Sequence, residues 1–64
     1  MEKTEILLTV RDVAEQLKVS ELTVRRIEAA GGLVAIQVKG QLRFEPSEVR
    51  RFINENKKEY KVNN

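Results

Sequence analysis

Apolar and polar positions follow each other at helical spacing near the start of the chain, in residues 9–18. The apolar side chains fall on one stripe, and the charged ones fall outside it, as in an amphipathic helix. The stripe consists of Val10, Val13, Ala14 and Leu17. Thr9 precedes it and can accept the backbone N–H near Asp12, whose acidic side chain suits a first turn. The pattern predicts a helix over about 10–18 that begins after Thr9.

A second helical pattern follows after a short connector. Ser20 is a suitable N-cap, and Val24 and Ile27 lie together when each residue turns 100° around the axis. The glycine pair 31–32 supplies the residue type that ends a helix at least cost. We expect a helix over about 21–30 whose Val24 and Ile27 face the first helix. Two short helices joined by a turn of this length form a helix-turn-helix pattern.

The outward face of this second helix carries small, apolar and basic side chains. These are Leu22, Arg25, Arg26 and Ala29, with Arg25 on the flank. Thr23 lies nearer the core, where its hydroxyl can bond at the helix start. The N–H groups there, with Ser20 and Thr23, suit a phosphate, while Glu21 would repel one unless it accepts from cytosine N4. On spacing alone, a solvated face and a nucleic-acid contact both remain open.

Residues 33–44 alternate around a Lys39-Gly40 turn and read as a β-hairpin, which we call the wing. A three-residue loop from Lys39 to Gln41 aligns the apolar side chains of both strands on one face, whereas a two-residue loop does not. These side chains are Ile36, Val38, Leu42 and Phe44. We therefore expect Gln37 and Arg43 on the outer face, with Lys39 and Gln41 at the tip. The wing would then cover the core and present basic groups outward.

The last segment opens with Pro46, which suits a first helical turn, and predicts a helix over about 46–56. Its apolar stripe of Val49, Phe52 and Ile53 would close the core. Arg50 and Arg51 face away from this stripe, and we interpret them as a solvated face balanced by Glu48 and Glu55. We expect one α+β domain over 1–56, followed by a polar, mobile tail over 57–64.

Composition narrows the function classes. A chain of 64 residues builds one small core. The chain has no Cys and no His, so it can form no disulfide and lacks the usual ligands of a structural metal ion. It also lacks the side chains that most often act as nucleophile or general base. We therefore expect no cofactor and no enzymatic activity. Its apolar run at 6–8 is too short for a membrane span, which favours a cytoplasmic protein. The charge is −2 over 1–21, +3 over 22–44 and +1 over 45–64. The basic middle favours a polyanionic partner.

The order helix, turn, helix, hairpin, helix resembles a known family. The stretch "LLTVRDVAEQLKVSELTVRRIEAAGGLVAIQVKGQLRF" is similar to the winged-helix domains of phage and transposon excisionases, which share a fold with the DNA-binding head of mercury-resistance (MerR) regulators. The resemblance covers residues 7–53 and lies mainly in "LLTV", "TVRR" and the hairpin. It implies a small α+β winged helix-turn-helix fold and double-stranded DNA as the partner.

The resemblance also implies roles for single residues. The second helix would enter the major groove, and the wing would lie along the adjacent minor groove or its phosphates. Arg26 would contact bases, with Arg25 placed for a phosphate or a base edge. Leu22 stands where the relatives have an acidic residue, and Gln41 where they have a wing-tip arginine. Lys39 and Arg43 would then supply the charge of the wing.

Three functions remain open at this stage. The first is an excisionase that binds side by side along DNA, bends it and helps a tyrosine integrase to excise a mobile element. The second is a small transcriptional regulator with the same domain. The third is a winged-helix module for protein interaction, which would show no salt-dependent DNA binding.

Overall fold

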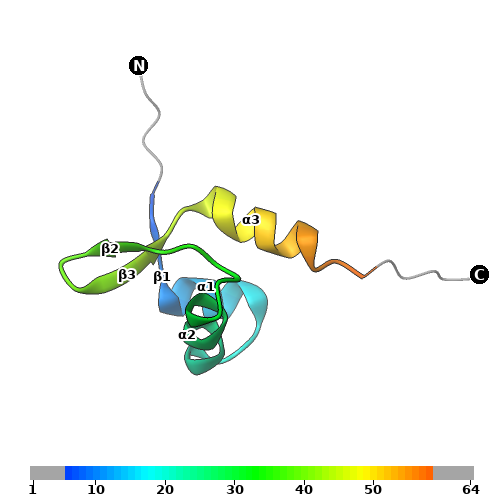
Figure 1. Cartoon of the computed structure of the whole chain (residues 1–64), viewed down its shortest axis with the longest axis horizontal. Coiled ribbons are helices and arrows are strands. Elements are labelled where there is room, and N and C mark those ends of the chain that lie inside the picture. Colours follow the sequence, from blue (N-terminus) through cyan, green and yellow to red (C-terminus); the bar gives the residue numbers. More distant parts are fainter. Residues whose placement is uncertain (1–5, 59–64) are drawn as a thin grey trace, which may run out of the picture.

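The computed structural model describes residues 6–58, and these fold into three helices and three short strands (Figure 1). In chain order the elements are β1 (Leu8–Thr9), α1 (Val10–Leu17), α2 (Glu21–Ala29), β2 (Ile36–Val38), β3 (Gln41–Phe44) and α3 (Pro46–Glu55). In the view of Figure 1, the helices α1 and α2 lie together at the bottom, the wing extends to the left, and α3 runs above them toward the right. All three expected helices are confirmed, with bounds that differ by one residue.

A reciprocal pair of hydrogen bonds starts α1 where the sequence predicts it. The Thr9 hydroxyl accepts the N–H of Asp12 at 3.0 Å, and the Asp12 carboxylate accepts the N–H of Thr9 at 2.9 Å. Together they form a capping box. The bond from the Thr9 backbone, followed by that with its side chain, holds the pKa of Asp12 below its ordinary value.

The ends of α2 also follow from local chemistry. The Ser20 hydroxyl accepts the N–H of Thr23 at 3.1 Å, as expected of an N-cap. At the other end Gly31 adopts a φ of 90°, and its N–H donates to the carbonyl of Glu28, while the N–H of Gly32 donates to that of Ile27 at 2.8 Å. This pair of bonds is a Schellman motif, which requires the left-handed conformation that glycine takes readily. The glycine pair therefore ends α2, as predicted.

The core gathers buried side chains from every helix, from β3 and from the segment between α2 and β2. Its members are Val10, Val13, Ala14, Val24, Leu33, Phe44 and Val49. Val24 and Phe44 are completely buried, and Ile27 packs against the cluster from α2. Tight burial of these side chains fixes how α1 and α2 cross, because large-to-small changes in such a core are costly.

The sheet has three strands where the sequence predicted a two-stranded hairpin. Its order is β1-β3-β2, and both pairings are antiparallel. The extra strand β1 pairs Leu8 with Phe44 and Thr9 with Arg43. Two residues are too few to show the alternation that marks a strand, so the sequence pattern could not reveal it. Through β1, the wing is tied directly to the start of α1.

The predicted register of the wing is wrong. Val38 pairs with Gln41, so the loop has two residues, Lys39 and Gly40, with φ of 52° and 79°. Two successive positive φ values match a type I′ turn, whose twist suits a hairpin. Gln37 then faces the same side as Leu42, and Arg43 the same side as Ile36. The expected outer face shared by Gln37 and Arg43 does not exist, and Gln41 is the first residue of β3 rather than a tip residue. All of β2 is exposed, so burial does not set this register and the turn does.

Arg51 joins α3 to the segment between α2 and the wing. Its guanidinium donates to the Gly32 carbonyl at 3.0 Å and pairs with Glu48 and Glu55 on its own helix. Glu48 also accepts the N–H of Val34 at 2.9 Å. The bond with Arg51, then that from Val34, lowers the pKa of Glu48, and the bond with Glu48 raises the pKa of Arg51. The expected balance of Arg51 by Glu48 and Glu55 is confirmed, and the contact with Gly32 adds a structural role.

This arrangement is a small α+β winged helix-turn-helix. Within residues 6–58, no helix has the length and apolar character needed to span a membrane. Most of the predicted tail, residues 59–64, lies outside the described residues.

Candidate nucleic-acid interface

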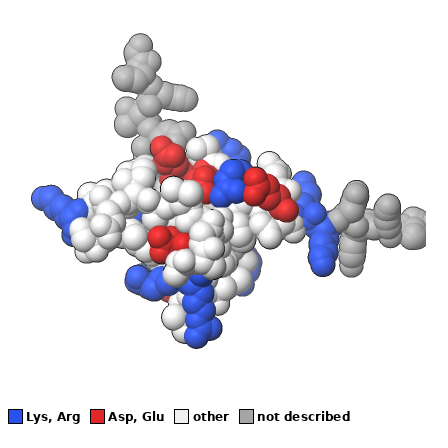
Figure 2. Space-filling view, in the orientation of Figure 1, with Lys and Arg blue, Asp and Glu red and all other residues white. Residues whose placement is uncertain are grey.

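The outer face of α2 is open to solvent, as the sequence predicts. Leu22 is 54% exposed, and Arg25 and Arg26 are exposed while Val24 between them is completely buried. Among residues 6–58 no carboxylate lies within salt-bridge distance of Arg25 or Arg26. Figure 2 shows basic side chains over α2 and at the tip of the wing. Both arginines are therefore available to a ligand.

The start of α2 is held by its own side chains. The hydroxyls of Ser20 and Thr23 lie 2.9 Å apart, and the Ser20 hydroxyl also accepts the N–H of Thr23. This cap orients the first turn of α2 and places Glu21 as its first helical residue. The structure thus shows Ser20 and Thr23 as capping residues of α2.

Two bonds hold Arg43 in the wing. Its guanidinium donates to the side-chain oxygen of Gln41 at 3.1 Å and to the carbonyl of Leu42 at 3.0 Å. Both acceptors are neutral, so these two bonds orient the guanidinium without pairing its charge, although the carboxylate of Asp12 is close enough for Arg43 to help lower its pKa. Gln41 thus positions a cation, a role that the sequence did not assign to it. Lys39 is exposed in the turn at the tip.

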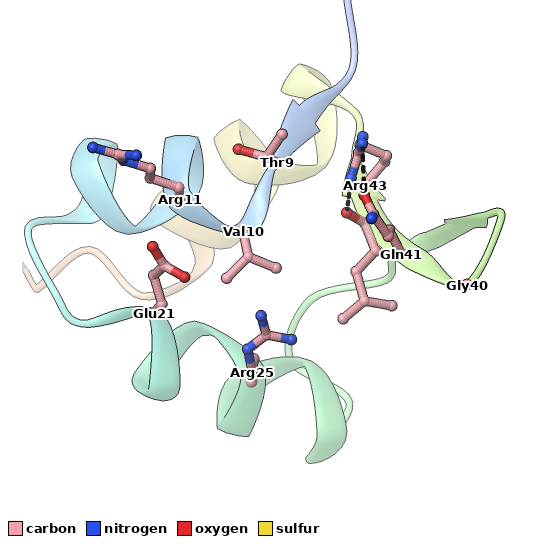
Figure 3. Close-up of a pocket in the computed structure, with 9 residues that line it drawn as sticks. Thr9, Val10, Arg11, Glu21, Arg25, Gly40, Gln41 and Arg43 are labelled. Atoms are coloured by element: carbon pink, nitrogen blue, oxygen red, sulfur yellow. Dashed lines mark hydrogen bonds between the residues drawn. The ribbon is translucent and has the colours of Figure 1, made fainter.

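An open groove of about 510 Å³ lies between the two helices and the wing, and we call it the central groove (Figure 3). Its lining comes from the start of α1, from α2 and from the turn and strand of the wing. The lining residues are Thr9, Val10, Arg11, Glu21, Arg25, Gly40, Gln41, Leu42 and Arg43. The fold therefore places α2 and the wing as two walls of one concave surface.

The central groove brings together four of the nine predicted site residues, which are Glu21, Arg25, Gln41 and Arg43. The other five, Ser20, Leu22, Thr23, Arg26 and Lys39, lie outside its lining. Figure 3 shows Glu21 and Arg25 extending from α2 toward the space between the helices and the wing. The predicted residues thus divide into a groove-lining set and a set on the α2 face and at the tip.

Sequence reasoning missed Arg11. This residue stands in the first turn of α1 and lines the groove, with a side chain that is 76% exposed. It forms an ion pair with Glu15 at 3.6 Å, and exposed pairs of this kind contribute little. A cation in a first turn is opposed by the helix dipole. That mismatch was the one signal in the sequence that could have drawn attention to Arg11.

Residues 7–57 match a family described as a helix-turn-helix domain. The chain belongs to this helix-turn-helix family. The match spans both helices of the motif, the wing and α3. No curated protein and no solved structure matches the chain significantly.

Membership of the helix-turn-helix family indicates what the exposed face of α2 contacts. In a helix-turn-helix domain the first helix supports the second, and the second contacts DNA. The buried contacts of α1 with Val24, and the exposure of Leu22, Arg25 and Arg26, fit that division of roles. The helix-turn-helix domain therefore indicates sequence-specific binding, with DNA as the partner, and domains of this family are typically not enzymes.

Proposed function

We propose that this helix-turn-helix domain inserts α2 into the major groove of duplex DNA and lays the wing along the adjacent minor groove or its phosphates. The observation that carries the proposal is the pairing of two walls: the exposed, basic face of α2 and the wing border the same concave surface. A duplex presents alternating grooves separated by a backbone, and this shape matches two projecting elements with a hollow between them.

Arg26 is the residue that we expect to read a base. It lies on the exposed face of α2, outside the lining of the central groove, with its guanidinium unpaired among the described residues. Its planar fork can bond to O6 and N7 of guanine together, which is worth about 1–3 kcal/mol of discrimination. Leu22, next to it on the outer face, suits the methyl group of a thymine. These two side chains would set the preferred sequence.

Lys39 is the residue that we expect at the second groove. It sits in the type I′ turn at the far end of the wing, exposed and remote from the core. A compact ammonium group at such a tip suits phosphates on either side of a narrow groove. The wing would therefore add affinity more than sequence preference.

For the biological role, we propose an excisionase. Such a protein binds neighbouring sites side by side and bends the ends of a mobile element, so that a tyrosine integrase can assemble there. Support comes from the resemblance in "TVRR" and in the wing. A small transcriptional regulator would use the same surface at a promoter. Either role places the protein in the compartment that holds DNA.

A binding experiment tests the proposal. Fluorescence anisotropy with random and element-end duplexes across a salt series should show binding that weakens steeply with salt. Arg26→Ala should lose the preference among sequences, whereas Arg50→Ala, an exposed arginine on α3, should keep it. If the parent protein binds no duplex at low salt while it stays folded, DNA binding is wrong and a protein partner is indicated.

A second experiment separates the two roles. Footprinting of the parent across an element end and across a nearby promoter locates the protected sites. Protection of adjacent sites at the element end, together with increased excision when integrase is added, supports the excisionase. Protection of the promoter alone, with no effect on excision, supports the regulator.

A further inference from the structure

Three arginines from three different elements surround the central groove. Arg11 comes from the first turn of α1, Arg25 from the middle of α2, and Arg43 from β3. In Figure 3, Arg25 reaches into the space between the walls, Arg43 stands on the opposite wall, and Arg11 lies on the rim. Like charges repel, so a cluster gathered from separate elements favours an anion between them.

The positive charge of this cluster is only partly compensated. The partners of Arg43 are a carbonyl and an amide oxygen, both neutral. The ion pair of Arg11 with Glu15 is exposed on both sides and weakly held. Glu21 is the one carboxylate among the residues that line the groove. Asp12 lies outside the lining, yet Arg11 and Arg43 both help to lower its pKa, so it offsets part of their charge. Within the lining itself, three cations against one carboxylate leave a net positive site.

We propose that the central groove seats a phosphodiester of the DNA backbone, held by Arg11, Arg25 and Arg43. The proposal rests on the DNA binding proposed above and makes it more specific. Because α2 and the wing would occupy neighbouring grooves, the strand that separates those grooves must pass between them. The hollow between α2 and the wing is the central groove, so that strand meets the three arginines.

The size of the hollow agrees with this occupant. Its 510 Å³ holds well over ten water molecules at roughly 30 Å³ each, which is enough for a phosphate with part of its sugar. Arginine guanidinium groups bind phosphate oxygens bidentately, and Gln41 holds one of the three in place beforehand. The groove therefore combines room, charge and a preset donor.

This placement divides the arginine pair of α2. Arg25 lines the groove and would hold the backbone, while Arg26 lies outside it and remains for a base. Arg11 would then set the distance between α1 and the same DNA strand. All three groove arginines would contribute affinity to every sequence alike, since phosphates carry no sequence information.

The test compares Arg11→Gln with the matched variant Arg50→Gln, an exposed arginine on α3 away from the groove. Binding of the full chain to a random-sequence duplex and to its preferred duplex is measured across a salt series. Loss of one phosphate contact should reduce the slope of log affinity against log salt by about 0.9, which is about eightfold between 1 M and 0.1 M. We expect this for Arg11→Gln on both duplexes, with sequence preference unchanged, and no change for Arg50→Gln.

The outcomes separate the two proposals. If the parent binds and Arg11→Gln behaves as Arg50→Gln does, the phosphate seat is wrong and DNA binding stands. If Arg11→Gln changes the order of preferred sequences, Arg11 reads a base, and the seat is again wrong. If the parent binds no DNA, the proposed function itself fails. Circular dichroism of each variant confirms that it is folded.

A variant that removes a negative charge from the groove, rather than a positive one, provides a second test. Glu21→Gln removes the one carboxylate from the lining, so binding should become tighter on random and preferred duplexes alike, because a nearby negative charge no longer repels the phosphate. A uniform gain supports the seat. If Glu21→Gln instead weakens binding to the preferred duplex alone, Glu21 meets a base, the backbone runs elsewhere, and the seat is overturned.

Discussion

Two helices of this protein carry the same local pattern, a valine, two arginines and an apolar residue, and the fold uses them in opposite ways. In α2 the pattern is "VRRI" at 24–27, and in α3 it is "VRRF" at 49–52. Val24 and Val49 are both buried. Yet Arg51 binds two carboxylates and the Gly32 carbonyl, whereas among residues 6–58 Arg25 and Arg26 lie within salt-bridge distance of no carboxylate.

The difference lies in the neighbours of each pair. Glu48 and Glu55 stand three and four residues from Arg51, at spacings that meet on one helix face. Around Arg26 the corresponding neighbours are Leu22, Thr23 and Ala29, which offer no charge. Glu21 and Glu28 stand at these spacings from Arg25, but neither lies within salt-bridge distance of it. An arginine is thus structural where its helix engages it with counter-ions, and it is free for an outside anion where its helix does not.

The largest effect on the structural side is expected at Gly32. A Cβ at this position would lie 2.8 Å from the Cγ2 atom of Ile27, and the β-branched side chain has little freedom to move away. Gly32→Ala should therefore lower the free energy of unfolding by about 1–3 kcal/mol, as overpacking does. Chemical denaturation measures this, with Gly31→Ala as a comparison in open space but at positive φ. A Gly32→Ala variant as stable as the parent would mean that Ile27 moves aside without cost.

Arg51 comes next. Arg51→Ala leaves the Gly32 carbonyl and Glu48 without their shared donor, and we expect a larger loss of unfolding free energy than from either exposed arginine of α2. Arg26→Ala on α2 should change stability by less than about 0.5 kcal/mol, since its side chain has no partner among residues 6–58. Thermal unfolding of the two variants side by side checks the contrast. Equal losses of stability in the two variants would show that the arginine pairs of α2 and α3 do not differ in structural role.

Low pH should weaken the contacts that Glu48 and Arg51 of α3 make with Val34 and Gly32. The pKa of Glu48 is lowered from 4.5 by Arg51 and by the Val34 N–H, so the charged carboxylate is favoured in the folded state. Its contribution is therefore full above about pH 4.5 and is lost as the pH falls through the lowered folded value. Glu48→Gln should flatten the decline of stability below pH 4.5, while Arg50→Ala should retain it. A Glu48→Gln variant with an unchanged acid slope would show that other carboxylates, such as Asp12, dominate.

The smallest effect is expected at the tip of the wing. Lys39 has a φ of 52°, a conformation that costs most residues energy and that asparagine tolerates. Lys39→Asn should raise the unfolding free energy by about 0.5 kcal/mol while it weakens DNA binding in low salt through the lost charge. Denaturation and anisotropy on the same samples measure both. A gain in stability without a loss of binding would remove Lys39 from the interface.

The sequence predicts the helices well because each has its own local signals. Thr9, Ser20 and Pro46 start the three helices, and the glycine pair 31–32 ends the second. The exposure of Leu22, Arg25 and Arg26 follows from the same helical geometry, since Val24 must be buried. These features depend on residues three or four apart, which is the range that a pattern covers.

Features that depend on distant contacts escaped prediction. The strand β1 forms because Leu8 pairs with Phe44 and Thr9 with Arg43, which lie 36 and 34 positions later in the chain. The groove position of Arg11 depends on how α1 packs beside the wing, and the contact of Arg51 with Gly32 joins residues 19 positions apart. The wing register failed for another reason: we assumed that apolar side chains would share a buried face, although Ile36 and Val38 remain partly exposed. In that segment backbone conformation outweighs burial.

The exposed wing has a consequence for how this domain evolves. Its tip is shaped by two residues with positive φ and touches none of the buried side chains that hold the helices together. Exposed residues of the wing can therefore change without loosening the core, provided that Gly40 and a residue that tolerates positive φ at position 39 keep the turn. Proteins with this fold can therefore change the contacts of the wing one residue at a time, while the residues of the core stay the same.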